Sequence, residues 1–478
     1  MASITLIAKE EWSFWLRSKL AVTASILFLL IVASTMAVTI SSVIDEREER
    51  RHHQLEAEEQ FLEQPDRHPH RMVHYGHYVY RTPSPLAVFD PGLDRITGQS
   101  IFLEGHRQNS ATLTAASVSA DMGGLSSLTP AIAYQLFAPL LLILLGHGAI
   151  TREREASTLS VMLAQGVSGL TVMLGKALAL SWVCLVLMIP LAVSGLVAIW
   201  VGESIISVAL MLFAYLVYLA IWVLITLIAS LTTQKQNKTL TALTASWLIL
   251  ILLVPSLSVS NVARALPIPG SIETNFAMLQ KIKSLGDGHN AADPAFKQLE
   301  RQLLNEYNVD SVDQLPINFR GVVAEYSEAN LTALLNEFAE QRMAAESAQR
   351  QRLNAHGWLT PILPIMDVSR TLAASDLANH HRFLREAEAL RFDFVQSLNR
   401  LHAEQLSYID DINRNDGPEG NLRARVDSEN WQVLDAFSFV PASAGLRVER
   451  SASSMTILLS WFLILALIAL RFSRRLSP

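Results

Sequence analysis

The stretch IISVALMLFAYLVYLAIWVLITLIASL (205–231) contains no charged residue and decides the class of fold. About 20 mostly apolar residues are enough for a helix to cross the ~30 Å hydrocarbon layer of a membrane. Five further runs have the same character, and they cover residues 21–44, 131–150, 176–200, 240–259 and 453–471. The sequence therefore predicts an α-helical membrane protein with six transmembrane helices.

The overall composition excludes several classes of protein. Half of the 478 residues are hydrophobic, and the formal net charge is only −6. No basic cluster with interleaved aromatic residues occurs, so nucleic acid is not expected as a partner. The single cysteine, Cys184, lies in the third predicted span and excludes an intrachain disulfide. The first span is too long for a signal peptide and lacks a small-residue cleavage site before Asp45, so it is expected to remain as an anchor.

The positions of lysine and arginine predict the topology, because short cytoplasmic loops are enriched in both. They gather before the first span, in the loops after the second and fourth spans, and after the sixth span: Lys9, Arg17, Lys19, Arg152, Arg154, Lys176, Lys235, Lys238, Arg471, Arg474 and Arg475. Both termini are then cytoplasmic, and residues 45–130 and 260–452 lie outside. Glu203, in the short turn before residue 205, is expected to reach water at the membrane interface.

The two outer segments read differently along their length. Residues 44–64 are rich in helix formers and predict a helix that continues the first span, whereas 77–109 predict short strands and turns. Residues 110–129 lead the chain back to the membrane. Amphipathic helices are predicted at 330–355 and 378–410. Between them, the apolar and proline-broken stretch 356–376 is expected to be a core-facing loop; the alternative is a segment against the membrane surface or a substrate path. Together they predict a mostly helical domain with some short strands.

No motif in the sequence indicates an enzyme. A phosphate-binding loop needs a glycine-rich turn ending in Gly-Lys-Ser/Thr. In GLTVMLGKA (169–177) the first glycine is one residue too early, and Ala177 replaces the hydroxyl that would bind magnesium. Gly-x-Ser-x-Gly and His-Glu-x-x-His are also missing from the sequence. We therefore expect no cofactor in this chain.

One histidine-rich stretch, RHPHRMVHYGH (67–77), could bind a metal ion. Imidazole is a common ligand of zinc and copper, and the candidate ligands are His68, His70, His74 and His77. Pro69 and Gly76 predict a loop without defined geometry. The alternative interpretation is a polar surface whose charge responds to pH.

A charged patch follows the second predicted span. TREREASTLSVMLAQGVSG (151–169) predicts a short helix in which Leu159, Met162 and Leu163 share one face. Its charges lie in the first turns. A short amphipathic helix between two spans is expected to dock on lipid headgroups or on a protein.

The wider stretch ITREREASTLSVMLAQGVSGLTVMLGK (150–176) resembles the ABC-2 type permeases. The matching positions are Glu155, Thr158, Leu159, Gly175 and Lys176, while Ser157 stands where the family usually has glycine. The resemblance implies that residues 151–175 form a coupling helix that fits a groove on a cytoplasmic ATP-binding subunit. The residues expected at that contact are Arg152, Glu153, Glu155, Thr158, Leu159, Met162 and Leu163.

Two other regions extend the resemblance. IAKEEWSFWLRSK (7–19) is similar to the interfacial helix of the family, here within residues 1–20, and carries Glu10, Glu11 and Arg17. HYGHYVYRTPSPLAVFDPGLDRITG (74–98) and LTPILPIMDVSRTLAASDLANHHRFLREAEALR (359–391) resemble a branch with large outer inserts. That branch has a domain of unknown function and is often encoded with an ATPase and a second permease, and some relatives are linked to copper-enzyme assembly.

The function implied by this resemblance is that of a permease subunit of an ATP-driven exporter in the bacterial inner membrane. ATP and magnesium would bind the partner subunit, and a second permease copy or a sister permease and membrane lipids would be further partners. The alternative is a mechanotransmitter or assembly factor that acts on a periplasmic protein, such as a metal enzyme, without moving a substrate. A structural membrane scaffold is a third reading. The residues do not specify the cargo.

Overall fold

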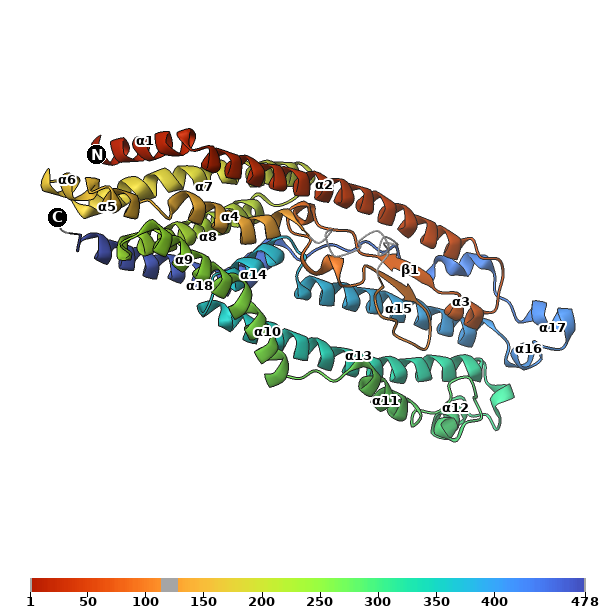
Figure 1. The fold of residues 1–478 in the computed structure, drawn as a ribbon. Coiled ribbons are helices and arrows are strands. Elements are labelled where there is room, and N and C mark those ends of the chain that lie inside the picture. Colours follow the sequence, from red (N-terminus) through yellow and green to blue (C-terminus); the bar gives the residue numbers. More distant parts are fainter. Residues whose placement is uncertain (1, 113–127, 477–478) are drawn as a thin grey trace.

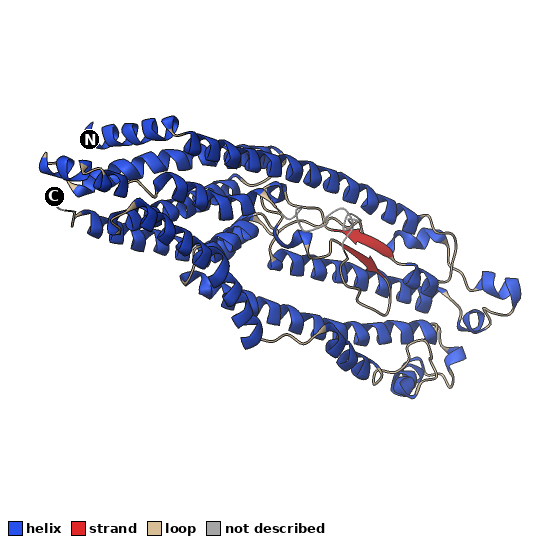
Figure 2. Ribbon diagram, viewed as in Figure 1, coloured by secondary structure: helices blue, strands red, loops and turns tan. Residues whose placement is uncertain are grey.

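The computed structural model describes residues 2–112 and 128–476, and most of them are helical (Figure 2). The first helix, α1 (Ala2–Arg17), and the C-terminal residues lie at one end of an elongated helix bundle (Figure 1). We call this the basal end. The predicted fold class is confirmed: the described residues form an α-helical membrane protein with two short strands.

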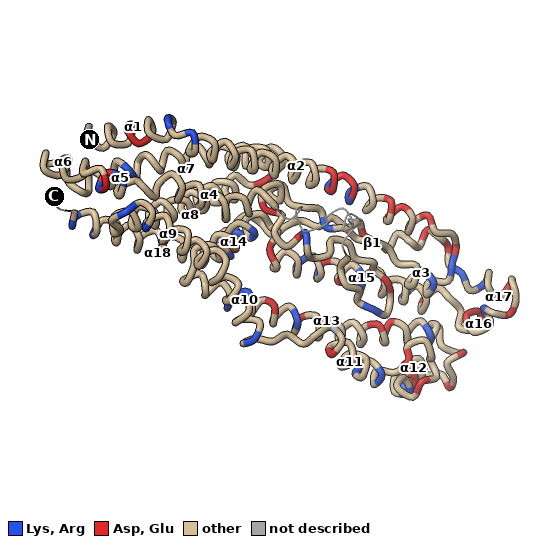
Figure 3. The backbone as a smooth tube through the Cα atoms, in the orientation of Figure 1, with Lys and Arg blue, Asp and Glu red and all other residues tan. Residues whose placement is uncertain are grey.

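Within the described residues, six stretches of helix are long and apolar enough to cross a membrane. They are α2 (Lys19–Leu62), Pro130–Glu155, α7 (Gly169–Trp200), α8 (Ile205–Thr232), Gln236–Ala265 and α18 (Ala444–Ser473). The second comprises α4 (Pro130–Gly146) and α5 (Thr151–Glu155). Charged residues are rare along the middle of the bundle and gather toward its two ends, as the apolar hydrocarbon layer requires (Figure 3).

The fifth stretch changes its helical winding midway. α9 (Gln236–Trp247) runs into a π-helical turn, η5 (Leu248–Leu253), before α10 (Val254–Ala265) begins. Pro255 is the second residue of α10 and has no N–H to donate, so the regular hydrogen-bond ladder cannot pass through it. The π turn accommodates this break without ending the helix.

Helix α8 lies at the centre of the bundle. It contacts α4, α7 and α18, and its Trp222, Tyr215 and Tyr218 are fully buried. Buried aromatic residues of this size contribute much of the packing energy of a core. The Tyr218 hydroxyl also donates to the carbonyl of Gln135 in α4 at 2.7 Å, which satisfies the polar end of the side chain.

Beyond the bundle, residues 45–112 and 266–443 form what we call the distal domain. As predicted, α2 continues outward from the bundle as one helix, and β1 (His77–Tyr80) pairs antiparallel with β2 (Ser100–Leu103). Thr112 makes an isolated bridge with Ser100. Most of the predicted return passage 110–129 lies outside the described residues.

The remaining distal elements are mainly helices. They are α3 (Pro69–Tyr75), α11 (Ser271–Ile282), α12 (Lys297–Tyr307), α13 (Phe319–Ala355), α14 (Ile362–Leu372), α15 (Leu377–Gln405), α16 (Tyr408–Ile412) and α17 (Gly417–Arg423). Short 3-10 turns occur at Pro85–Val88, Gly92–Arg95, Pro294–Phe296, Val312–Gln314, His356–Trp358 and Ser428–Val433.

One hydrophobic core joins the two distal segments. It contains Phe61 and Ile101 from the first segment and Phe394 and Trp431 from the second, all buried. The Trp431 indole donates to the carbonyl of Gln64 at 2.9 Å. Residues separated by more than 300 positions therefore stabilise a single domain by burying a shared apolar surface.

The predicted loop at 356–376 is wrong in its secondary structure. This stretch forms α14, whose apolar side is buried against α8 and α18. Pro361 is the N-cap and Pro364 lies in the first turn, where a helix needs no N–H donor, so neither proline breaks it. The Tyr215 hydroxyl donates to Ser369 Oγ at 3.1 Å and joins α8 to α14. The stretch does face a core, as the sequence indicated.

Two further expectations need correction. The histidine-rich stretch is not a loop, because Pro69 starts α3 and Gly76 ends it. Glu203 does not reach water: it is buried, and its carboxylate accepts from Arg447 Nη2 at 2.6 Å and from Ser84 Oγ at 3.3 Å. A buried carboxylate needs such partners because its desolvation is costly.

Candidate functional site

The charged patch at 151–155 lies at the basal end, next to α6 (Thr158–Ala164) in Figure 1, and its Arg152 contacts α1. It does not open a single helix as the sequence predicted. Instead α5 ends at Glu155, and α6 follows as a second short helix. Ser157 between them has φ +60°, a left-handed conformation that stops the first helix. A glycine at this position would adopt this conformation more readily.

The four charged residues of α5 hold four different helices. Arg152 Nη2 donates to Glu11 Oε2 of α1 at 2.6 Å, and its guanidinium also stacks 3.7 Å from the ring of Phe14. Glu153 Oε1 accepts from Lys176 Nζ of α7 at 2.9 Å. Alternating charges therefore attach α5 to α1 on one side and to α7 on the other.

The next two charges secure the loop between α8 and α9. Arg154 Nη2 donates to the carbonyl of Leu231 at 3.1 Å, and Nη1 donates to the carbonyl of Thr233. The last carbonyls of a helix have no partner within it, so a guanidinium there both satisfies them and complements the helix dipole. Glu155 accepts from the backbone N–H of Gln236 at 3.1 Å and from its side chain at 2.6 Å, at the start of α9.

Glu11, Arg152, Glu153 and Lys176 form what we call the basal charge network. Glu11 is fully buried and Lys176 is 3% exposed, and the two form an ion pair at 2.6 Å. Charges removed from water in this way are tolerated only when they are paired. The structure therefore distinguishes the two acidic candidates of α1, because Glu10 is exposed. Arg17, at the last turn of α1, is exposed as well.

Helix α1 approaches α7 very closely at Gly175. A Cβ atom at this position would lie 2.7 Å from the side chain of Ile7 and 3.1 Å from the carbonyl of Ile4. Trp12 and Trp15 fasten the same helix by donating to the carbonyls of Ala179 and Leu145 at 3.2 and 3.0 Å. Glycine at 175 thus allows the contact that brings Glu11 to Lys176.

The apolar face of α6 turns toward the chain itself. Leu159 is buried, and Met162 and Leu163 pack with it against residues of α7 and α8. The chain itself therefore covers Leu159, whereas Met162 and Leu163 are only partly buried, and the expected contact of these residues with a separate partner stays a prediction. We call the opposite side the exposed α6 face; it consists of Thr158, Ser160, Val161, Ala164 and Gln165. Thr158 Oγ1 also donates to Glu153 Oε2 at 2.6 Å, which ties this face to the basal charge network.

The four predicted metal-binding histidines do not form one group. His70 and His74 lie together on α3, near His106 and His289. His68 is buried and contacts Asp411 at 3.1 Å. His77 packs between aromatic rings of the distal core, and burial lowers its pKa to about 4.

His68 belongs to a buried ion network around Asp411. The carboxylate is contacted by His402 Nε2 at 2.7 Å and by Arg414 Nη1 at 2.9 Å, and Asn318 donates to it at 3.2 Å. Burial alone would raise the pKa of Asp411, but the bonds from His402 and His68 outweigh it and hold this pKa well below its usual range. With arginine so close, the carboxylate is already neutralised without a metal ion.

Comparison with known proteins identifies one region. Residues 275–440 match a family described as a domain of unknown function (DUF3526). The match extends from α11 to the segment before α18 and therefore covers much of the distal domain and none of the six long apolar stretches. No curated protein matches the chain.

Sequence reasoning missed several residues of these sites. Arg154 was used only as a topology signal, and His106 and His289 were not considered because they lie far from 67–77 in the chain. One local signal was available for α3: proline at the first helical position and glycine just after the last predict a short helix, on which His70 and His74 share a face.

Proposed function

We propose that this chain is the membrane-spanning subunit of an ATP-driven exporter of the ABC-2 type. It would pair with a second copy of itself or with a sister permease, and each would bind a cytoplasmic ATP-binding subunit. The basal end would lie in the cytoplasm of a bacterial cell, with the distal domain on the other side of the inner membrane. The resemblance of residues 7–19 and 150–176 to that family supports the proposal.

The observation that carries this proposal is the attachment of α5 to four other helices. Arg152, Glu153, Arg154 and Glu155 contact α1, α7, the end of α8 and the start of α9. A displacement of α5 and α6 would therefore be transmitted to these helices together. Such helices would move between two distinct packed arrangements, because close-packed interfaces do not deform continuously.

The exposed α6 face is the surface on which we expect the ATP-binding subunit to dock. Its side chains are small or uncharged, and Val161 is 55% exposed. Leu159 on the buried side would hold α6 to the bundle, so that a force on α6 reaches α7 and α8. The ATP-binding subunit would supply ATP and magnesium, and this chain would supply no catalytic group.

Purification of the chain from its native membrane tests this proposal. We expect stoichiometric ATPase activity to copurify with the wild-type protein. Val161→Arg should abolish copurification, because it places a charge within the proposed contact. Val440→Arg is the matched control, since Val440 is 61% exposed and lies in the distal domain. ATPase activity that is unaffected by Val161→Arg would exclude this docking face.

A second function is favoured by the way the bundle meets the distal domain. Helix α2 runs without interruption through 44 residues, a length of about 66 Å, from the bundle into the distal core. Helix α14 of the distal domain packs against α8 and α18. Continuous and close connections between the bundle and the distal domain suit a mechanotransmitter that moves the distal domain to act on a periplasmic protein.

The two functions predict different results from crosslinking in living cells. A mechanotransmitter should give a crosslink between the distal domain and one periplasmic protein, and its abundance should change when ATP is depleted. An exporter should instead give a small-molecule efflux defect on deletion. An efflux defect without any ATP-dependent distal crosslink would exclude the second function.

A further inference from the structure

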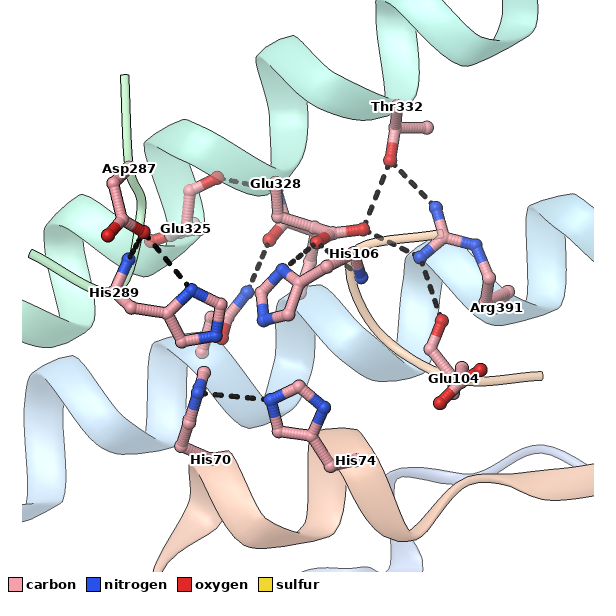
Figure 4. Close-up of polar contacts among 12 residues, drawn as sticks. His70, His74, Glu104, His106, Asp287, His289, Glu325, Glu328, Thr332 and Arg391 are labelled. Atoms are coloured by element: carbon pink, nitrogen blue, oxygen red, sulfur yellow. Dashed lines mark hydrogen bonds and ion pairs between the residues drawn. The ribbon is translucent and has the colours of Figure 1, made fainter. Parts of the chain in front are cut away.

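Four histidine side chains from distant parts of the chain meet on the distal domain. His70 and His74 come from α3, His106 from the turn after β2, and His289 from the loop before α12 (Figure 4). One ring nitrogen of each lies within 4.8 Å of the others. The six ring-centroid separations range from 4.7 to 5.9 Å.

The two histidines of α3 are placed by helical geometry. Residues four apart lie on the same side of a helix, and the Nε2 atoms of His70 and His74 are 3.3 Å apart. In a tetrahedral zinc site with Zn–N bonds of 2.0–2.1 Å, neighbouring nitrogen atoms are about 3.3 Å apart. This pair therefore already has the separation of one edge of such a site.

His106 is oriented by a buried carboxylate. Glu328 Oε2 lies 2.9 Å from His106 Nδ1 and 3.1 Å from its backbone nitrogen. Nε2 of His106 is buried and has no hydrogen-bond partner among the described residues. His106 also has φ +64°, a left-handed conformation that is uncommon outside glycine and is often found at functional positions.

Glu328 is itself held firmly in place. It is fully buried on α13 and forms an ion pair with Arg391 of α15 at 2.6 Å. A carboxylate that contacts the second nitrogen of a histidine is the usual outer partner of a metal ligand.

His289 is positioned by its own loop. Asp287 Oδ1 lies 3.3 Å from His289 Nδ1 and accepts from the backbone N–H of the same residue at 3.0 Å. The loop lies close to α13: a Cβ atom at Gly288 would lie 2.3 Å from Ser327 Oγ. His289 and His74 are exposed, which leaves an entry path for an ion from solution.

We propose that His70, His74, His106 and His289 bind one Zn²⁺ ion. Four imidazole ligands whose nitrogen atoms lie within 4.8 Å of one another, one pair of them at 3.3 Å, suit a structural zinc site with four protein ligands. The buried group of His68, His402 and Asp411 differs, because Arg414 and Arg320 lie beside its carboxylate and would repel a cation. The zinc site is independent of the proposed transport function and does not require a partner subunit.

The ion would connect the two distal segments. His289 lies in the loop that links α11 to the α12 region, whereas the other ligands belong to residues before the second span. Bound zinc would therefore fasten residues 283–293 to α3 and to the turn after β2. A ligand that binds only the folded arrangement stabilises that arrangement.

Metal titration of the full-length protein in detergent, after chelator treatment, tests the proposal. We expect one Co²⁺ per chain with the visible absorption of a four-coordinate site, displaced by Zn²⁺. His74→Ala and His289→Ala should each weaken binding by at least about tenfold. Both side chains are exposed, so neither change should disturb folding. His53→Ala, an exposed histidine of α2, is the matched control and should bind as the wild type does.

A second measurement concerns the loop itself. Zinc should slow hydrogen exchange of residues 283–293 in the wild type and in His53→Ala, and should have no effect in His289→Ala. The absence of stoichiometric binding, unchanged affinity in His289→Ala, or binding of Cu²⁺ without Zn²⁺ would overturn the zinc assignment. Zinc binding that leaves exchange of this loop unchanged would contradict the link between the two segments.

Discussion

Replacement of Glu11 by glutamine tests the basal charge network. Glu11 is fully buried and neutralises both Lys176 and Arg152. Removing one partner of a buried ion pair costs about 3–5 kcal/mol, because the other charge stays buried without compensation. Glu153 remains 2.9 Å from Lys176, so we expect a loss near the lower limit, about 3 kcal/mol.

Thermal unfolding in detergent measures this loss. An unfolding entropy of about 2.1 cal/mol/K per residue gives about 1 kcal/mol/K for 478 residues, so Tm should fall by about 3 °C. Glu10→Gln is the matched control: the side chain is adjacent but exposed, and we expect its Tm to match the wild type. Equal shifts for the two variants would refute the reasoning, since they would show that burial and pairing of Glu11 have no energetic consequence.

Two further predictions concern single positions. His77 is buried, and its pKa is about 4 in the folded chain and about 6.5 in the unfolded chain. Between these two pH values the unfolded chain binds more protons than the folded chain. The free energy of unfolding should therefore fall as the pH drops from 6.5 toward 4. The loss of unfolding free energy at pH 5 should be about 2 kcal/mol relative to neutral pH, and His77→Leu should remove this loss. If Tm falls by the same amount between pH 7.5 and pH 5 in the wild type and in the variant, this prediction is wrong. Gly175→Ala should lower stability by about 1–3 kcal/mol because the new methyl group meets Ile7 at 2.7 Å. Gly445→Ala, where a Cβ atom has open space, should not lower Tm, and similar losses in both glycine variants would refute the close approach of α1 to α7.

The membrane-spanning part of the fold could be predicted because apolar runs carry a strong and local signal. Residues 205–231 lie within α8, and the helix predicted beyond the first span is the distal part of α2. Helix bounds were less accurate: α18 begins at Ala444, well before its apolar part. Its first turns carry Arg447, whose partner Glu203 lies across the bundle and gives no sign in the local sequence.

Proline explains the main errors of secondary structure. Pro361, Pro364 and Pro69 were interpreted as signs of loops, but all three lie at or just inside the start of a helix. At these positions a missing N–H costs nothing, because the first turn has no acceptor for it. Proline alone therefore could not distinguish a loop from a helix start.

The sites depend on contacts that sequence patterns do not carry. Helical spacing identified the apolar face of α6, but it could not indicate whether Leu159 faces a partner or the chain's own α7 and α8. In the same way, Glu10 and Glu11 are equivalent in the sequence, and only packing against α7 selects Glu11. The histidines of α3 could be found locally, whereas His106 and His289 join them only through the tertiary fold.

The central claim is that an ATP-binding subunit docks on the exposed α6 face, and site-specific photocrosslinking in living cells tests it most directly. A photoreactive residue at Val161 should give a crosslink to a protein whose sequence contains a phosphate-binding Gly-Lys-Ser/Thr loop. The same residue at Ile96, which is 74% exposed in the distal domain, should give no such crosslink. The account would be contradicted if the residue at position 161 crosslinked only to lipid. It would also be contradicted if the ATP-binding protein were crosslinked from position 96 instead of position 161.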